Sequence, residues 1–277
     1  MYLSITVILA GAMSVLFLIL TKWCTHLYDI WMFIPVFLVC FIISFIIVLF
    51  FIFVPTIFIS KKKKYTTKSN YWRITMKYVC QMILQLLRVE INYRGLENVP
   101  DDKAFVLVQN HNSLVDPVVT IWSIRHIDLI FLMKQEILKF PFVGRGLYRL
   151  DFPALDRKNN REGLKTIVNT INMIKEGRHS VGVYPEGTRS KDGKLHEFKA
   201  GSFKIPEKCN CPLVVSVLYG TDKIKKRFPF RKTQVYIDFI ACLNPSDYNG
   251  ENTADLSEEV YKLMNDRLEL IKEEVNE

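Results

Sequence analysis

Two long stretches near the start of this 277-residue chain contain no charged side chain. They are residues 1–21 and residues 30–60, and the second contains 31 uncharged residues in a row. About 20 consecutive apolar residues are enough for one helix to cross a hydrocarbon core roughly 30 Å thick. The missing charge therefore argues against a fully soluble protein and predicts an N-terminal membrane anchor of two hydrophobic helices.

The first uncharged stretch also lacks the basic residues that precede the apolar run of a secretory signal, and a second long stretch follows it closely. The linker, residues 22–29, is short enough to join two antiparallel helices, so we expect a hairpin with both ends on one side of the membrane. Pro35 and Pro55 are expected to trim or kink the second helix. A re-entrant hairpin that enters one leaflet is the alternative, and the sequence leaves it open.

Acidic residues are missing from residues 61–89, where eight basic residues occur. This run begins where the second apolar stretch ends, and a polybasic segment beside a span is typical of a cytoplasmic surface facing anionic lipid. We therefore predict a membrane protein whose remaining residues lie on the cytoplasmic side. The net charge of +9 is also compatible with nucleic-acid binding. Because the bases do not form a separate soluble module, we expect membrane lipids and no nucleic acid as partners.

The six cysteines match neither a disulfide framework nor a zinc site. Cys209 and Cys211 form one CxC pair, but a zinc site would need a second pair or histidines at ligand spacing. We therefore expect reduced thiols and no metal site. The chain also lacks a G-x-S-x-G sequence, which argues against Ser113 as a nucleophile with His111 as its base.

Beyond residue 60, short apolar runs alternate with segments of helical periodicity. The helical segments are residues 78–89, 160–175 and 256–271. The predicted strands are residues 105–108, 129–133, 181–184, 213–218 and 235–241. This alternation predicts an α/β fold with a mixed, largely buried sheet flanked by helices. The chain is thus expected to consist of an anchor, residues 1–60, and one further domain, residues 61–277.

His111 closely follows the predicted strand 105–108, and Asp116 comes five residues later. On one continuous helix, side chains five residues apart point about 140° away from each other and do not meet. They can meet if His111 lies in a loop and Asp116 caps a helix that begins at Pro117, since aspartate and proline suit those positions. An aspartate that holds one ring nitrogen of a histidine leaves the other free to take a proton from a hydroxyl.

A second polar segment, residues 184–190 (YPEGTRS), follows another predicted strand. A turn at Gly187 with hydroxyl and guanidinium groups beside it offers hydrogen-bond donors to an anion. The forked guanidinium of Arg189 suits phosphate in particular. For this segment taken alone, a polar surface turn without a function is the alternative.

Taken together, His111-x4-Asp116 and Glu186-Gly187-Thr188-Arg189 resemble the first and third motifs of the glycerolipid acyltransferase family. The likeness is greatest to the 1-acylglycerol-3-phosphate acyltransferase branch and covers roughly residues 75–245. Between the two motifs, Lys134-x-Glu136 and Leu155-Asp156-Arg157 resemble the region of the family's second motif, and residues 198–201 (FKAG) resemble the segment after its third. Residues 211–215 resemble the fourth motif but lack its usual second proline near Ser216, a difference that concerns the acyl-chain pocket.

The resemblance implies the fold of the glycerol-3-phosphate acyltransferases and a reaction that moves an acyl group from a thioester to lysophosphatidate, giving phosphatidic acid. It implies that His111 is the general base and that Asp116 orients it. It also implies a set of phosphate-binding residues, which comprises Glu186, Gly187, Thr188, Arg189, Arg157 and Lys134. The co-substrate would be acyl-CoA or an acyl carrier protein, and no metal or redox cofactor is expected because a thioester is already activated.

Two alternatives remain open at this point. One is an acyltransferase with a different acceptor, such as glycerol 3-phosphate or another lysophospholipid, because the motifs are shared. The other is a non-catalytic lipid-binding protein on the same fold, although such a protein has no need for an oriented base. A separate basic segment, residues 223–232 (KIKKRFPFRK), is compatible with a second membrane contact, a docking patch for an acyl carrier, or a solvated loop.

Overall fold

The structure is a computed structural model that describes residues 2–21, 31, 33–65, 67–190 and 192–276. The predicted linker, residues 22–29, lies outside these residues. The chain divides into two compact units, of which the first comprises Met1–Lys64 with Pro141–Gly146 and the second comprises Tyr65–Phe140 with Leu147–Glu277. The assignment of residues 1–60 to an anchor and residues 61–277 to a catalytic domain stays a prediction.

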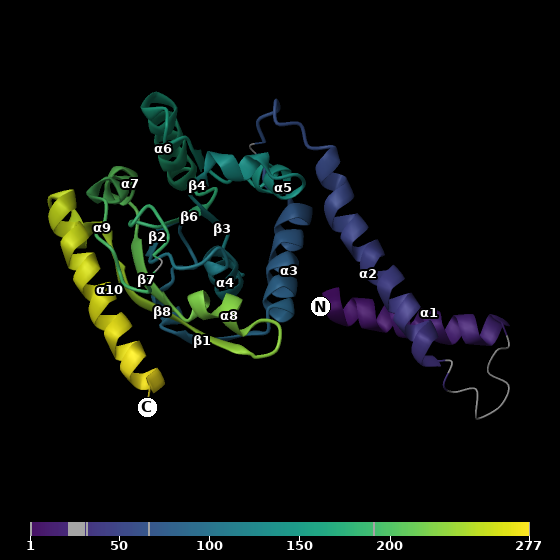
Figure 1. Cartoon of the computed structure of the whole chain (residues 1–277). Helices are drawn as coiled ribbons and strands as arrows, with labels where there is room; N and C mark the ends of the chain where they lie inside the picture. Colours follow the sequence, from purple (N-terminus) through teal and green to yellow (C-terminus); the bar gives the residue numbers. More distant parts are fainter. Residues whose placement is uncertain (1, 22–30, 32, 66, 191, 277) are drawn as a thin grey trace. The chain divides into compact units, whose positions relative to one another are not determined.

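The first unit contains two apolar helices, α1 (Tyr2–Thr21) and α2 (Phe33–Ile57), which pack against each other (Figure 1). Their buried residues recur at every fourth position and include Ala10, Ser14, Leu18, Cys40, Ser44, Val48 and Ile52. Small side chains at a helix contact let two backbones approach closely, as is typical of helix pairs in lipid. The Ser44 hydroxyl donates to the Met13 sulfur across this contact, over 3.5 Å.

Within the described residues, α2 is the one helix that is long and apolar enough to cross a membrane. Its 25 residues correspond to about 37 Å at 1.5 Å per residue, which exceeds the hydrocarbon thickness. The apolar part of α1, Thr6–Thr21, is shorter. The predicted membrane association is therefore supported by α2, whereas the prediction of two spanning helices is supported only in part.

The second unit is built on a six-stranded sheet with the order β1–β8–β7–β2–β6–β3. Its strands are β1 (Val89–Arg94), β2 (Val106–Gln109), β3 (Leu129–Phe131), β6 (Ser180–Val183), β7 (Leu213–Tyr219) and β8 (Thr233–Leu243). Strands β2, β3, β6 and β7 run parallel, while β8 runs antiparallel to β7 and parallel to β1. Every residue of β2 and β6 is buried, which is typical of parallel strands covered on both faces.

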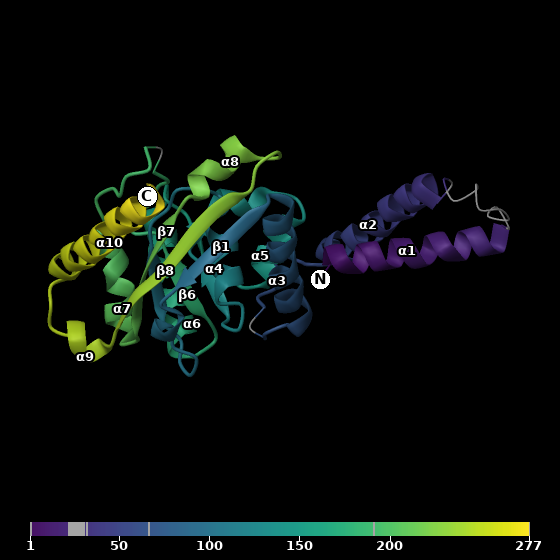
Figure 2. The same ribbon diagram turned by 90° about the horizontal axis from the view of Figure 1, so that it is seen from below.

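Helices cover the two faces of this sheet. The helices after α2 are α3 (Asn70–Leu86), α4 (Asp116–Ser123), α5 (Val143–Arg149), α6 (Asn160–Lys175), α7 (Lys204–Cys209), α8 (Ile224–Arg227), α9 (Pro245–Tyr248) and α10 (Thr253–Asn276), and α5 is divided between the two units. In Figures 1 and 2 the sheet lies between α10 on one side and α3 and α4 on the other. The predicted mixed, buried sheet flanked by helices is confirmed, and the helix predicted at residues 160–175 coincides with α6.

Two local predictions differ from the structure. The helix expected at residues 78–89 is α3, which begins at Asn70 and ends at Leu86, and β1 follows directly. Arg88 has a φ of 55°, so the helix cannot continue, and the chain then alternates apolar and polar residues with the period of a strand. The strand expected at residues 129–133 is divided between β3 and β4 (Met133–Lys134), and β4 pairs with β5 (Ala154–Leu155) in a small separate sheet.

Gly182 in β6 provides a test of how tightly the sheet is packed. A Cβ atom at this position would lie 2.3 Å from the Phe131 ring, which covers the glycine. We expect G182A to lower the free energy of unfolding by about 1–3 kcal/mol, because the ring must move in a filled core. Denaturant unfolding in detergent measures this change. G146A, where a Cβ meets nothing within 4 Å, is the control. Equal stability of G182A and the parent would contradict the expectation.

Candidate active site

Three loops meet at one edge of the sheet because β7, β2 and β6 are adjacent and parallel. We call this the carboxyl edge, since all three strands end there. His111 lies two residues beyond β2, Tyr184 directly follows β6, and Thr221 lies two residues beyond β7. Open α/β sheets place ligand sites at the carboxyl ends of parallel strands. The topology therefore brings together the two motifs found in the sequence and places the segment around Thr221 beside them.

His111 and Asp116 form the expected pair. The Nδ1 atom of His111 lies 2.8 Å from Oδ2 of Asp116, and the Asp116 side chain is fully buried. The Nε2 atom of His111 makes no hydrogen bond to any residue that the structure describes. A carboxylate at Nδ1 fixes the tautomer that carries its proton there, so Nε2 is left as the basic nitrogen.

Asp116 differs from its prediction in one respect. Helix α4 begins at Asp116 itself, and the carboxylate does not cap the amides of its own helix. Its Oδ2 atom instead accepts the backbone N–H groups of Asn112 and Ser113, over 2.6 and 2.7 Å. The carboxylate is thus turned back toward the loop, which explains how side chains five residues apart can meet.

Thr221 supplies the remaining hydrogen bond to this carboxylate. Its hydroxyl donates to Oδ1 of Asp116 over 2.6 Å, and its side chain is 1% exposed. Both oxygens of this buried carboxylate are therefore occupied by hydrogen-bond donors. Thr221 is absent from the residues predicted from the sequence. The available signal was its position just beyond a predicted strand at the carboxyl edge.

The His111 ring is also held by stacking. Tyr184 lies parallel to it with ring centroids 4.0 Å apart and an interplanar angle of 13°. Phe131 stacks on the far side of Tyr184 at 5.1 Å. Burial raises the pKa of the Tyr184 phenol well above its usual range, and the charge of Asp116 adds to this effect. Tyr184 therefore stays neutral and acts as a flat apolar support for the imidazole.

Glu186 faces inward and links the loops of the two motifs. One carboxylate oxygen accepts the N–H of His111 over 2.8 Å, and the other accepts the N–H of His196 over 3.2 Å. Burial raises the pKa of Glu186, and these two amides partly oppose that shift. The backbone of the same loops is joined further by the Ser190 N–H, which donates to the His111 carbonyl over 2.8 Å. This geometry favours a scaffolding role for Glu186, whereas its predicted contact with phosphate stays a prediction.

The turn after Glu186 presents the groups expected to bind an anion. Gly187 has a φ of +73°, and a Cβ there would lie 2.9 Å from the Lys199 ammonium, so the turn requires glycine. Thr188 and Arg189 are exposed and line an open hollow of about 410 Å³ together with Asp192 and His196. Lys199 was not predicted as a site residue, although its charge lies directly against the turn.

Lys134 and Arg157 lie on the small second sheet. Lys134 is in β4, opposite Leu155 in β5, and Arg157 follows two residues later. Both side chains are exposed, and neither is hydrogen bonded to the His111 or Glu186 loops in the described part of the chain.

Within that same part, no three His, Cys, Asp or Glu side chains lie close enough to hold a metal ion. The expectation that no metal is needed stays a prediction.

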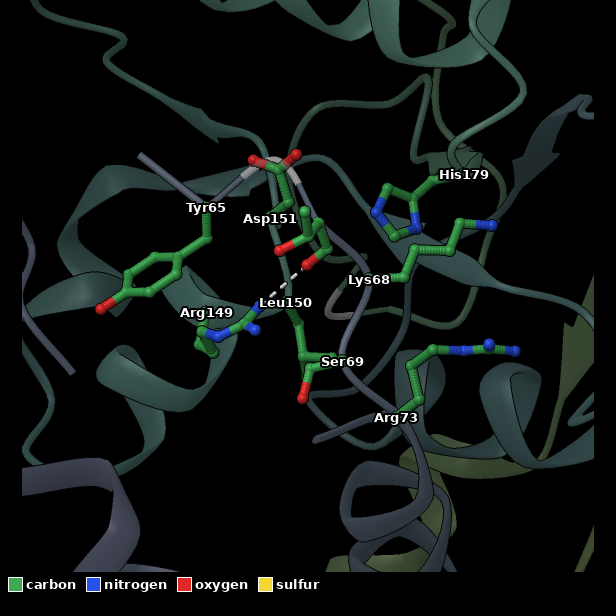
Figure 3. Close-up of a pocket in the computed structure, with 9 residues that line it drawn as sticks. Tyr65, Lys68, Ser69, Arg73, Arg149, Leu150, Asp151 and His179 are labelled. Atoms are coloured by element: carbon green, nitrogen blue, oxygen red, sulfur yellow. Dashed lines mark hydrogen bonds between the residues drawn. The ribbon is translucent and has the colours of Figure 1, made fainter. Parts of the chain in front are cut away.

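A separate hollow lies at the opposite edge of the sheet, where β3 and β6 begin (Figure 3). Lys68 and Arg73 both pair with Asp128 there, and Arg149 donates to the Thr67 carbonyl over 3.2 Å. Burial lowers the pKa of His179 to about 4, so its ring is neutral at pH 7. The charges in this hollow are largely paired with one another, and it is not part of the carboxyl edge.

Thr221 provides a test of the support beneath His111. T221V keeps the side-chain volume but leaves Oδ1 of Asp116 without its donor. A hydrogen bond to a charged group contributes about 1.5–3 kcal/mol, so we expect kcat to fall roughly ten- to a hundredfold. T221S retains the hydroxyl and should restore most of the rate. Equal rates for T221V and T221S would contradict this role.

Glu186 can be tested with a neutral amide of the same shape. In E186Q one oxygen becomes an NH₂ group, so one of the two backbone N–H groups loses its acceptor. We expect a loss of about 1–3 kcal/mol in stability and a lower kcat, measured by thermal unfolding and by steady-state kinetics of the reaction that the motifs imply. E197Q, at an exposed neighbouring position, is the control. Equal stability and equal kcat of E186Q and E197Q would contradict the role of Glu186 in linking the two loops.

Comparisons with known proteins agree with this geometry. Residues 90–219 match the family model described as Acyltransferase. The chain is 30% identical to a 1-acyl-sn-glycerol-3-phosphate acyltransferase of Borreliella burgdorferi over 205 residues, which are 72% of this chain and 80% of that protein. It is 36% identical over 136 residues to the chloroplastic enzyme LPAT1 of Arabidopsis thaliana, covering 49% of this chain and 37% of the plant protein.

The fold matches a solved structure as well. The crystal structure of PlsC, the 1-acyl-sn-glycerophosphate acyltransferase of Thermotoga maritima, superposes with a TM-score of 0.60 at 24% identity, covering 82% of this chain and 92% of that one. This structural likeness shows the fold alone. Family membership is shown by the sequence match to the Borreliella burgdorferi protein. Together with the family model and the paired motifs at one sheet edge, that match establishes that this chain belongs to the 1-acyl-sn-glycerol-3-phosphate acyltransferase family.

Proposed function

We propose that this protein transfers a fatty acyl group from an acyl thioester to the free hydroxyl of 1-acylglycerol 3-phosphate, giving phosphatidic acid. The observation that carries the proposal is the His111–Asp116 pair, which leaves Nε2 of His111 free in a loop that Glu186 joins to the turn of Thr188 and Arg189. Family membership agrees with this chemistry. A binding protein has no use for a histidine whose tautomer is fixed by a fully bonded, buried carboxylate.

The proposed reaction needs one proton acceptor. Nε2 of His111 takes the hydroxyl proton as the hydroxyl oxygen attacks the carbonyl carbon of the thioester. The carbon–sulfur bond then breaks, and the leaving thiolate takes the proton back from the imidazolium. Asp116 stabilises the imidazolium while it exists, because its carboxylate remains hydrogen bonded to Nδ1. No covalent acyl-enzyme forms, and the thioester needs no metal or redox cofactor for activation.

The acceptor's phosphate would lie at the turn after Glu186. Thr188 and Arg189 face the open hollow there, and the Lys199 ammonium covers Gly187. We assign Arg189 the main charge contact, since its guanidinium can bind two phosphate oxygens at once. Arg157 and Lys134 would add positive charge from the small sheet, with acyl-CoA or an acyl carrier protein as the acyl donor.

The membrane would supply the acceptor and hold the product. Helix α2 has the length and composition of a membrane span, and four consecutive lysines, residues 61–64, follow it. Such a basic run is typical of the cytoplasmic side. We therefore place the second unit on the cytoplasmic face, where an acyl thioester is available and lysophosphatidate is reached from the lipid.

The central test is H111A. We expect this variant to lose acyl transfer by about 100- to 10,000-fold, the usual contribution of a general base, while it still folds and fractionates with membranes. Thioester consumption with lysophosphatidate in lipid or detergent measures the rate. H126A is the control, since His126 is an exposed histidine paired with Asp101. Near-normal activity of H111A would overturn the mechanism.

The same assay separates the candidate acceptors. Lysophosphatidate should be consumed faster than lysophospholipids without a terminal phosphate, because we assign the turn at Gly187 to a phosphate monoester. It should also be consumed faster than glycerol 3-phosphate, which carries the same phosphate but has no acyl chain to hold it in the lipid. A preference for glycerol 3-phosphate would replace the proposed acceptor but keep the role of His111. Absence of transfer to every acceptor would remove the enzymatic proposal.

A further inference from the structure

The segment between β7 and β8 forms a basic loop, residues 223–232, at the carboxyl edge of the sheet. Because β8 runs antiparallel to β7, the segment leaves and re-enters the sheet on the same edge that carries His111. It contains six basic residues and no acidic one. Figure 2 shows α8 and the following turn standing out beside the start of β8.

The tip of the basic loop exposes two aromatic rings. Phe230 is 85% exposed and Phe228 is 47% exposed. Leu114, in the loop between His111 and Asp116, is 70% exposed on the same edge. Large apolar side chains that stand exposed at the same edge of a sheet as a run of bases are unusual on a surface that contacts only water. They are typical of a surface that enters the boundary between lipid head groups and acyl chains.

The basic loop is held in a fixed shape. Ile224 is buried in the core at its start, and Arg88 donates from one guanidinium nitrogen to the carbonyls of Pro229 and Phe230, over 3.2 Å each. The Arg231 N–H also donates to the Arg227 carbonyl over 2.9 Å. The exposed rings are therefore presented by an ordered turn, so that inserting them into lipid costs little conformational entropy.

Three of the six charges of the basic loop are available to a partner. Within the described residues, its ion pairs are limited to the one that joins Lys232 to Glu90. Lys225, Lys226 and Arg231 are exposed and unpaired in that same part of the chain. Lysine near an anionic bilayer contributes attraction through its charge while its apolar stem lies along the acyl chains. The combination of rings and unpaired bases suits a lipid surface better than an acidic protein, which would bind the charges but not the rings.

We propose that the basic loop and Leu114 form a second membrane contact, which docks the carboxyl edge of the sheet on an anionic lipid surface. This contact is independent of α2, and it does not depend on the reaction assigned to His111. Docking at this edge also orients the second unit for that reaction, because the open side of the site then faces the lipid that holds the acceptor.

A fluorescence experiment tests the contact with the full chain in vesicles. F230W is reconstituted into phosphatidylcholine alone or mixed with phosphatidylglycerol, and the lipids carry bromine on their acyl chains near the head group. The parent chain gives the background of the native tryptophans. We expect strong additional quenching for F230W, and more in the anionic vesicles. V168W, at an exposed position on α6, is the control, since both views separate α6 from α8.

Quenching of F230W no greater than that of V168W would overturn the proposal. Protection of F230W by an added acidic acyl carrier protein, without quenching by lipid, would also overturn it and identify a protein partner. Neither result depends on catalysis, so the outcome is readable even if the protein transfers no acyl group.

A second experiment joins docking to activity. The triple variant K225E/K226E/F230S changes only residues outside the catalytic and phosphate-binding groups. We expect its apparent KM for lysophosphatidate in anionic vesicles to rise about tenfold or more, with activity in detergent micelles unchanged. An equal loss in vesicles and micelles would indicate a structural defect and contradict docking.

Discussion

The site depends on one buried carboxylate. Asp116 is fully enclosed, and a charge in such a place is tolerated only when donors occupy both of its oxygens. The donors come from the His111 ring, the amides of the loop that follows it, and the Thr221 hydroxyl beyond a neighbouring strand. The requirement to satisfy this one group therefore positions the base and ties together two loops that are more than a hundred residues apart in sequence.

A second inward carboxylate extends the same principle. Glu186 accepts amides from the His111 loop and from the segment near His196. Both carboxylates are thus hydrogen bonded within the protein. The hollow at the turn presents Thr188 and Arg189 beside Asp192, whose carboxylate is itself bonded to the Ser190 hydroxyl and the His196 ring. Because both inward carboxylates are occupied by donors of the protein, a site for an anionic lipid can contain them with little repulsion of its substrate.

Much of this arrangement could be predicted from local sequence patterns. The period of residues 160–175 predicts α6 correctly, and the spacing of His111 and Asp116 predicts a loop that meets a helix start. Thr221 and the Tyr184–Phe131 stack escaped prediction, because their contacts depend on which strands are neighbours. Strand β1 was not predicted for a local reason. The helix before it ends at a left-handed residue, Arg88, and an arginine there gives no sequence signal of the kind that a glycine would give.

The reversed direction of β8 has a consequence for how the family can diversify. A parallel strand after β7 would need a crossover to the far edge, and its connection would be fixed by helix packing. An antiparallel β8 returns directly, so the tip of its connection can change in length and composition while the pairing of β7 with β8 stays intact. The charge and length of this loop can therefore be changed without displacing the strands that position His111.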